Sequence, residues 1–211
     1  ANPRASRTVP FVSKAVGTPL AKVATKIMLG ASLAELDLPE FTGTHVSVKE
    51  AVLPFSRFAG ADSVLGPEMK STGEVIGIGP DFPTAFGKAQ AAAGVSLPES
   101  GTVFISVTDT DKAAATQLAA LLHDLGFDVV ATGGTAQAIS RMGIPVRKIH
   151  KIAEGSPNVV DLIENLECDL IINTPTGSGA RADGYEIRSA AITHGIASIT
   201  TMTGASAAVR A

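Results

Sequence analysis

Residues 127–135 read Phe-Asp-Val-Val-Ala-Thr-Gly-Gly-Thr, and this stretch decides the fold. Its first, largely apolar part predicts a strand over residues 127–131. The Thr-Gly-Gly-Thr turn ends that strand, and we expect a short helix to follow as far as Met142. The stretch therefore predicts one strand–turn–helix unit of an α/β protein.

The same alternation continues on both sides of this unit. Further strands are expected at residues 102–107, 145–149, 169–173 and 197–201, and further helices at residues 111–125, 159–165, 185–194 and 203–211. Gly126 is expected to close the helix that precedes the quoted stretch. Strand–helix repetition with apolar strands is typical of a parallel sheet that helices cover on both faces. We therefore predict a Rossmann-like α/β sheet for residues 102–211.

Residues 1–93 show no such alternation. An Arg-bearing loop is expected first, and then a helix in which Thr18 can cap the start, Pro19 suits the first position and Gly30 can end it. Two strands are expected at residues 45–55 and 72–78, and a second helix at residues 81–93. This pattern indicates part of an α+β unit whose other strands are missing. The Gly/Pro/Ser cluster at residues 94–101 is the expected linker to the sheet.

Composition narrows the class of protein. The chain has 211 residues with 17 Lys and Arg against 20 Asp and Glu, so no basic excess indicates a nucleic-acid partner. The single cysteine, Cys168, excludes an internal disulfide and is expected to be a small core residue. No apolar run is long enough for a membrane helix and no signal peptide is visible, so we expect no membrane contact and a cytoplasmic location. The absent starting Met and the helix at the last residues favour a piece of a longer chain.

Three predicted strands end in polar loops of small residues. These loops are residues 108–112, 132–135 and 174–179, and open parallel sheets bind ligands beyond the carboxyl ends of their strands. The Thr-Gly-Gly-Thr loop offers backbone N–H groups, threonine hydroxyls and a helix N-terminus, which together suit a phosphate. Lys112 and Lys151 can add positive charge. An ordinary strand–helix turn explains the same residues equally well, so both interpretations stay open.

Neighbouring polar residues have plainer explanations. Asp109 and Asp111 can act as a carboxylate pair, but we favour Asp111 as the N-cap of the helix that follows. Lys148 and His150 are expected on the solvated face of a loop.

The first residues form a dense polar cluster. Arg4 and Arg7 can grip phosphate or carboxylate oxygens, and Asn2 can complete a Mg²⁺ shell. From composition alone, an exposed and frayed terminus is the better explanation.

Several long runs then point to a known family. They are Asn-Pro-Arg-Ala-Ser-Arg at residues 2–7 with its continuation to residue 15, Ser-Val-Lys-Glu at 47–50, Val-Leu-Pro-Phe at 52–55, and Leu-Gly-Pro-Glu-Met-Lys-Ser-Thr-Gly-Glu-Val at 65–75. These runs closely resemble the end of the second ATP-grasp unit in the carbamoyl-phosphate synthetase large-subunit family. The second half resembles that subunit's C-terminal allosteric domain, which shares its fold with methylglyoxal synthase. The resemblance implies an ATP-grasp portion at 1–93, a linker at 94–101 and a methylglyoxal-synthase-like domain at 102–211.

The resemblance also implies an activity for the parent enzyme. Members of the family are ligases that make carbamoyl phosphate, for pyrimidine and arginine biosynthesis, from bicarbonate, glutamine-derived ammonia and two ATP, with Mg or Mn. At the matching positions Asn2 would hold the metal, and Arg4 and Arg7 would contact phosphate as catalytic residues. The expected partners are the rest of the large subunit and the glutamine-hydrolysing small subunit. This chain alone is expected to be catalytically incomplete.

The family's allosteric domain binds nucleotide monophosphates, commonly UMP and in some members IMP. The matching positions here are Ser106, Lys112, Thr132, Gly133, Gly134, Thr135, Lys151, Asn173 and Thr174. Ornithine activation in some members uses residues that match Glu50 and Thr200. Two positions depart from the family pattern, since Pro175 replaces a Thr and Gly133 replaces a His found in some members. Pro175 removes a backbone donor and a hydroxyl, so the effector preference is expected to depend on it.

Two alternatives remain. A methylglyoxal-synthase-like lyase would use the same cradle for dihydroxyacetone phosphate, with Asp183 as the nearest downstream carboxylate after the loop at Asn173. A non-binding structural cap would keep the fold and bind nothing.

Overall fold

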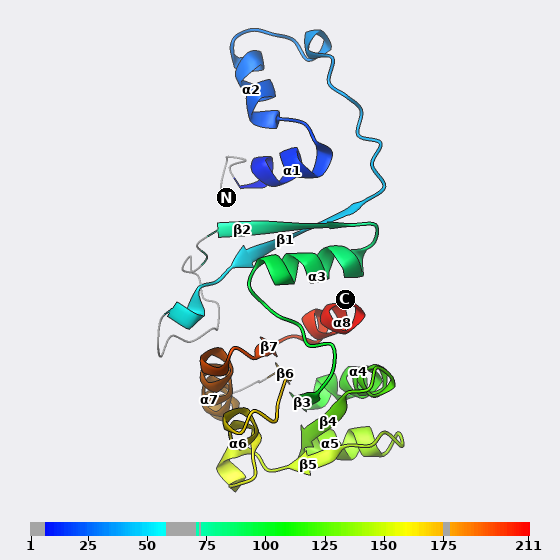
Figure 1. The fold of residues 1–211 in the computed structure, drawn as a ribbon, viewed down its shortest axis with the longest axis vertical. Helices are drawn as coiled ribbons and strands as arrows, with labels where there is room; N and C mark the ends of the chain where they lie inside the picture. Colours follow the sequence, from blue (N-terminus) through cyan, green and yellow to red (C-terminus); the bar gives the residue numbers. More distant parts are fainter. Residues whose placement is uncertain (1–6, 58–70, 72, 175–177) are drawn as a thin grey trace.

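The computed structural model describes residues 7–57, 71, 73–174 and 178–211, which form a two-stranded antiparallel sheet and a five-stranded parallel sheet (Figure 1). Asn2, Arg4 and Pro175, which the sequence singles out, lie outside these residues.

The parallel sheet confirms the predicted α/β architecture. Its strands, in chain order, are β3 (Thr102–Val107), β4 (Asp128–Thr132), β5 (Arg147–Ile149), β6 (Leu170–Thr174) and β7 (Ala197–Ile199). Their spatial order is β5-β4-β3-β6-β7, and every neighbouring pair is parallel. The central strand β3 therefore has β4 on one side and β6 on the other.

Helices cover both faces of this sheet, as predicted. One face packs against α4 (Lys112–Asp124), α5 (Gly133–Ser140) and α8 (Met202–Arg210), and the other against α6 (Val159–Glu164) and α7 (Ser178–His194) (Figure 1). Successive residues of β3 alternate between the two cores: Val103 and Ile105 face α4, whereas Phe104 faces α6 and α7. A parallel sheet buried on both faces needs apolar residues at both sets of positions, and β3 supplies them.

Helix α7 begins earlier than the sequence indicates. A start at Tyr185 was expected, whereas the helix begins at Ser178. Its first turns include Gly179 and Gly184, and glycine weakens the helical pattern on which a sequence prediction depends.

The preceding residues form a smaller unit. Its elements are α1 (Thr8–Val16), α2 (Leu20–Met28), the 3₁₀ turn η1 (Ala34–Leu36), β1 (Val46–Val52), the 3₁₀ turn η2 (Phe55–Arg57), β2 (Gly73–Gly79) and α3 (Phe82–Ala92). The hairpin β1–β2 is antiparallel, and α3 lies against it. A Cβ at Gly77 would collide with the backbone of Ala85 and Ala89, so this glycine allows α3 to approach the hairpin closely. Asp81 caps α3 by accepting a hydrogen bond from the Thr84 N–H at 2.9 Å.

Two expectations for the first helices are wrong. Residues 8–16 form a helix where a loop was expected, because Pro10 lies in the first turn, where proline is tolerated. The side chain of Thr18 does not cap α2. The N–H of Leu20, the first residue of α2, instead donates to Ser13 Oγ at 3.2 Å. Gly30 follows the end of α2 with a φ of 103°, the left-handed conformation expected of a terminating glycine.

Residues 93–101 connect α3 to β3 and contain no helix or strand. Val95 and Leu97 pack against the α4 side of the sheet core, so the connection is held to the sheet by apolar contacts. None of the helices in the described part of the chain is long and apolar enough to cross a membrane.

Candidate functional site

The sheet order creates a crevice at the carboxyl ends of its central strands. The chain leaves β3 toward β4 and later returns to β6 on the opposite side, and such a reversal is where open α/β sheets bind ligands. A cavity of about 350 Å³ opens at this point. Its polar lining includes eight of the nine residues expected at an effector site: Ser106, Lys112, Thr132, Gly134, Thr135, Lys151, Asn173 and Thr174. The ninth, Gly133, lines a neighbouring hollow with Lys148 instead.

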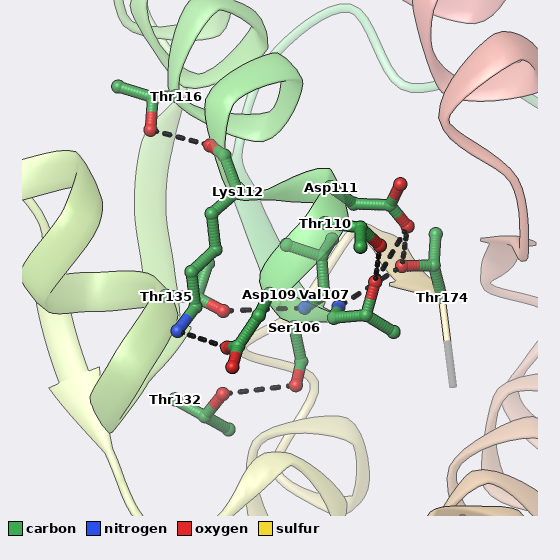
Figure 2. A network of polar contacts seen from close by, with 11 residues as sticks. Ser106, Val107, Asp109, Thr110, Asp111, Lys112, Thr116, Thr132, Thr135 and Thr174 are labelled. Carbon is green, nitrogen blue, oxygen red and sulfur yellow. Dashed lines mark hydrogen bonds and ion pairs between the residues drawn. The ribbon is translucent and has the colours of Figure 1, made fainter. Parts of the chain in front are cut away.

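Hydrogen bonds join β3 to the Thr-Gly-Gly-Thr loop (Figure 2). The hydroxyls of Ser106 and Thr132 lie 3.0 Å apart and share a hydrogen bond. The Val107 N–H donates to Thr135 Oγ1 at 3.3 Å. Thr132 and Thr135 are buried, so these bonds fix the loop that begins α5 against the end of the central strand.

On the other side, β6 is tied to the 3₁₀ turn η3 (Asp109–Asp111) by the carboxylate of Asp111. Thr174 Oγ1 donates to Asp111 Oδ2 at 2.7 Å, and Thr108 Oγ1 donates to the same oxygen at 3.2 Å (Figure 2). The expectation that the Asp111 side chain caps α4 is therefore wrong. The carboxylate accepts hydrogen bonds from the hydroxyls of Thr108 and Thr174, and it makes none with the N–H groups of α4. We name this set of contacts among Thr108, Asp111 and Thr174 the Asp111 clasp.

Lys112 is the best placed cation of the cavity. Its ammonium lies 2.6 Å from Asp109 Oδ1. It also lies over the first turn of α5, since a Cβ built on Gly134 would be 3.0 Å from Lys112 Nζ. The pKa of the Asp109 carboxyl is lowered because Lys112 donates a hydrogen bond to it and adds Coulombic stabilisation, with a smaller Coulombic contribution from Lys151.

The structure adds residues to the cavity lining beyond those expected at an effector site. Apolar side chains of Phe104, Ile152, Val159 and Ile187 line one part of the cavity, and His150 and Asp183 supply polar groups. The expectation of a merely solvated loop for His150 is therefore too simple, because its half-exposed ring borders the cavity. Lys148 belongs to strand β5 and not to a loop. Apolar residues from β3, α6 and α7 cannot be assigned to a site by motif, since they meet only after folding.

The remaining expected residues lie away from the cavity. Arg7 is exposed and contacts Glu74 Oε1 at 3.4 Å and Ser71 Oγ at 3.5 Å. Glu50, in β1, accepts a hydrogen bond from Gln90 of α3 at 2.9 Å, and Thr200 lies exposed after β7. Within the described ranges, no group of three or more His, Cys, Asp or Glu side chains is arranged to hold a metal ion.

Comparison with known proteins shows a family match over part of this region. Residues 114–200 match the family described as "MGS-like domain". The matched segment begins within α4 and ends just after β7, and it contains the ends of β4 and β6 that line the cavity.

The similarity to known proteins extends beyond the matched segment to the whole chain. The chain is 53% identical over 211 residues to the carbamoyl phosphate synthase large chain of Rhodopirellula baltica. It is 54% identical to the large chain of Methanocorpusculum labreanum and 56% identical to that of Archaeoglobus fulgidus, in both cases with 100% of this chain covered. The chain spans about 20% of the length of these relatives.

Proposed function

We propose that this chain is the C-terminal part of a carbamoyl phosphate synthase large chain, and that its cavity binds a nucleotide monophosphate, UMP or IMP, which regulates the parent enzyme. The observation that carries the proposal is the gathering of eight expected effector residues around one cavity at the ends of β3, β4 and β6. These residues come from three strands and the segments that follow strands, so the convergence of these separate parts of the chain is not a consequence of sequence proximity.

The polar part of the cavity suits a phosphate. The N-terminus of α5 presents backbone N–H groups and a positive dipole end, and the Lys112 ammonium lies over the same turn. Among the hydrogen bonds of the described residues, Thr135 Oγ1 accepts from the Val107 N–H, which leaves the threonine hydrogen to be donated to a ligand oxygen. A phosphate here would receive donors from both the backbone and side chains.

The apolar part suits the rest of a nucleotide. Phe104 and Val159 lie beside Ile152 and Ile187 in the lining, and His150 and Asp183 add hydrogen-bonding groups. Ligand cavities range from about 300 to 1,000 Å³, and the 350 Å³ found here lies at the small end of this range. One nucleoside monophosphate is a ligand of suitable size and polarity.

The activity of the parent enzyme forms part of the same proposal. It is the ATP-dependent synthesis of carbamoyl phosphate from bicarbonate and glutamine-derived ammonia, with Mg or Mn, in partnership with a glutamine-hydrolysing small subunit. Residues 1–93 would belong to an ATP-grasp unit, in which Asn2 would hold metal and Arg4 and Arg7 would contact phosphate. Glu50 and Thr200 would serve ornithine regulation. Similarity to large chains over the whole of this chain supports this assignment.

Regulation requires that the effector favour one arrangement of the two parts of the chain. Residues 94–101 are the proposed linker, and Val95 and Leu97 within it pack on the sheet core. Helix α3 also contacts α8, so both the linker and a helix contact can transmit a change. We expect a coupling free energy of about 1–3 kcal/mol, the usual range for allosteric effectors.

Calorimetric titration of this chain with UMP, IMP and inorganic phosphate tests the effector site. We expect UMP or IMP to bind more tightly than phosphate, and Lys112→Ala to weaken the binding by about tenfold or more, because a charge-assisted hydrogen bond is lost. Thr135→Ala should weaken it less. Lys26→Ala is the matched control, since it removes the same charge from an exposed position on α2.

The same titration has outcomes that contradict the proposal. Binding that is equal for the nucleotides and phosphate would leave only an anion site. No binding by a folded chain, repeated on the complete large chain, would identify residues 102–211 as a structural cap.

A lyase acting on dihydroxyacetone phosphate is the second candidate. The observation in its favour is that His150 and Asp183 line the same cavity as the phosphate-binding loop, so an imidazole and a carboxylate are both near the place of a substrate. An assay for methylglyoxal formation from dihydroxyacetone phosphate separates the candidates. We expect no product from this chain, and turnover that is lost in His150→Gln and Asp183→Asn would favour the lyase.

A further inference from the structure

The ammonium group that best suits a phosphate is already paired. Lys112 Nζ lies 2.6 Å from Asp109 Oδ1, and both residues line the cavity. Figure 2 draws this ion pair as a dashed line. A phosphate on the first turn of α5 would need the same ammonium, because Lys112 Nζ lies over Gly134. The carboxylate therefore occupies the contact that an incoming anion would make.

The two partners differ in how freely they can move. The side chain of Lys112 is 29% exposed, and its residue is fixed in the first turn of α4, where its carbonyl accepts the Thr116 hydroxyl at 2.7 Å. The side chain of Asp109 is 93% exposed. Asp109 can therefore rotate toward solvent at small cost, whereas Lys112 remains at the cavity.

The other carboxylate of this turn behaves differently. Asp111 accepts hydrogen bonds from Thr174 and Thr108, and these bonds hold it away from the cation. The residues that line the cavity include two lysines, Lys112 and Lys151, and two aspartates, Asp109 and Asp183. With Asp109 in place, the formal charges of these four groups cancel, so an anion gains little from the cavity until this carboxylate withdraws.

We propose that Asp109 competes with the ligand's phosphate for the Lys112 ammonium and so sets how tightly this cavity binds anions. The proposal rests on the effector site described under the proposed function. A phosphate monoester carries a charge between −1.5 and −2 near pH 7, and backbone N–H groups of α5 assist it, so it can displace a single exposed carboxylate. An anion that carries less charge, or that does not reach the N–H groups of α5, cannot displace the Asp109 carboxylate.

The lowered pKa of Asp109 agrees with this competition. Lys112 stabilises the charged carboxylate, so Asp109 remains an anion throughout the pH range in which a phosphate monoester takes its second charge, near pH 6. The competitor is thus present whenever the phosphate is fully charged.

Calorimetric titration with UMP and with inorganic phosphate tests the competition in this chain. Asp109→Asn removes the charge and keeps the shape, and we expect both ligands to bind about threefold to fivefold more tightly, because the exposed carboxylate makes only a weak ion pair. In the Lys112→Ala background the same substitution should change affinity by less than about twofold, since no ammonium remains to be contested. Asp124→Asn, at the far exposed end of α4, removes an equal charge and should leave affinity unchanged. Thermal unfolding of each variant verifies that it is folded.

The outcomes separate this inference from the function on which it depends. Wild-type binding that Asp109→Asn leaves unchanged or weakens overturns the competition and leaves the effector site standing. An equal gain in Asp124→Asn or in the Lys112→Ala background also overturns it, since the effect would then be one of net charge. Binding in Asp109→Asn with none in wild type supports both proposals. If neither protein binds UMP or phosphate, both proposals fall.

Discussion

The two parts of the described chain bury apolar surface to very different extents. Between residues 7 and 93, the fully buried apolar side chains in the described ranges are Ala85 and Ala89 of α3. Helices α1 and α2 bury no residue, and Met28 is 86% exposed. In residues 102–211, by contrast, both faces of the parallel sheet carry a continuous core of large aliphatic side chains.

This difference indicates where the stability of the chain resides. Burial of apolar surface is the dominant favourable contribution to folding, and alanine side chains supply little of it. We therefore expect residues 102–211 to unfold as one cooperative unit and residues 7–93 to contribute weakly. The exposed side chains of α2 agree with the proposal that residues 1–93 belong to a larger ATP-grasp unit.

The largest expected effect is a core substitution in the parallel sheet. Ile171 is fully buried in β6, beside Phe104 in the core under α6 and α7. Ile171→Ala should lower the free energy of unfolding by about 2–5 kcal/mol, because apolar contacts are lost and a cavity remains. Urea denaturation followed by far-ultraviolet circular dichroism measures this loss.

Met28→Ala is the matched substitution in the other region. Its side chain is exposed, so we expect a change within about 0.5 kcal/mol. Similar losses for Met28→Ala and Ile171→Ala would contradict the contrast between the two regions.

The fold of the stable region is the part that sequence predicts best. Apolar runs such as residues 169–173 alternate with helical segments, and a parallel sheet needs that pattern because both its faces are covered. Residues 8–16 are harder, because Pro10 gives a signal against helix that only its place in the first turn cancels. Local patterns thus predict elements whose burial is regular, and they fail for α1, where a proline obscures the helical pattern.

The residues of the cavity also differ in how well sequence predicts them. Thr132, Gly134 and Thr135 are predictable as one wall of the cavity, because a Gly-rich turn after a strand carries its own signal. Asp111 is not, since its partner Thr174 lies 63 residues away and only the pairing of β3 with β6 brings the two together. His150 likewise reaches the cavity through the position of β5 in the sheet.

Alkaline pH should destabilise the sheet region through its single cysteine. Burial raises the pKa of the Cys168 thiol from 9.0 to about 11. Between these values the unfolded chain loses the thiol proton and the folded chain keeps it, so the stabilisation is complete below about pH 9 and is lost as the pH rises toward 11. A shift of this size is equivalent to about 2–3 kcal/mol.

A difference measurement isolates this thiol from the other groups that titrate at high pH. The free energy of unfolding is measured from pH 8 to pH 11 for wild type and Cys168→Ala, and the gap between the two curves should change across the interval. Parallel curves would show that the buried thiol is not coupled to folding. The rate at which a thiol reagent labels Cys168 reports the opening of this region alone, because the chain contains no other cysteine.

The last comparison takes one cross-link from each region. Asp111→Ala removes the Asp111 clasp, in which a partly buried carboxylate accepts two hydroxyl donors, and should cost about 1–3 kcal/mol. Gln90→Ala removes one hydrogen bond from α3 to Glu50 of β1, and should cost about 0.5–1.5 kcal/mol.

The two substitutions should also differ in how far through the molecule they loosen the structure. Because the clasp joins the end of β6 to η3, which directly follows the central strand β3, Asp111→Ala should raise amide exchange throughout the five-stranded sheet. Gln90→Ala should raise it in β1, β2 and α3 alone, since those elements lack a core that would spread the loss. Hydrogen exchange followed by mass spectrometry resolves both patterns. Faster exchange of β3 and β6 in Gln90→Ala would mean that the hairpin and the sheet unfold together, which would remove the distinction between the two regions.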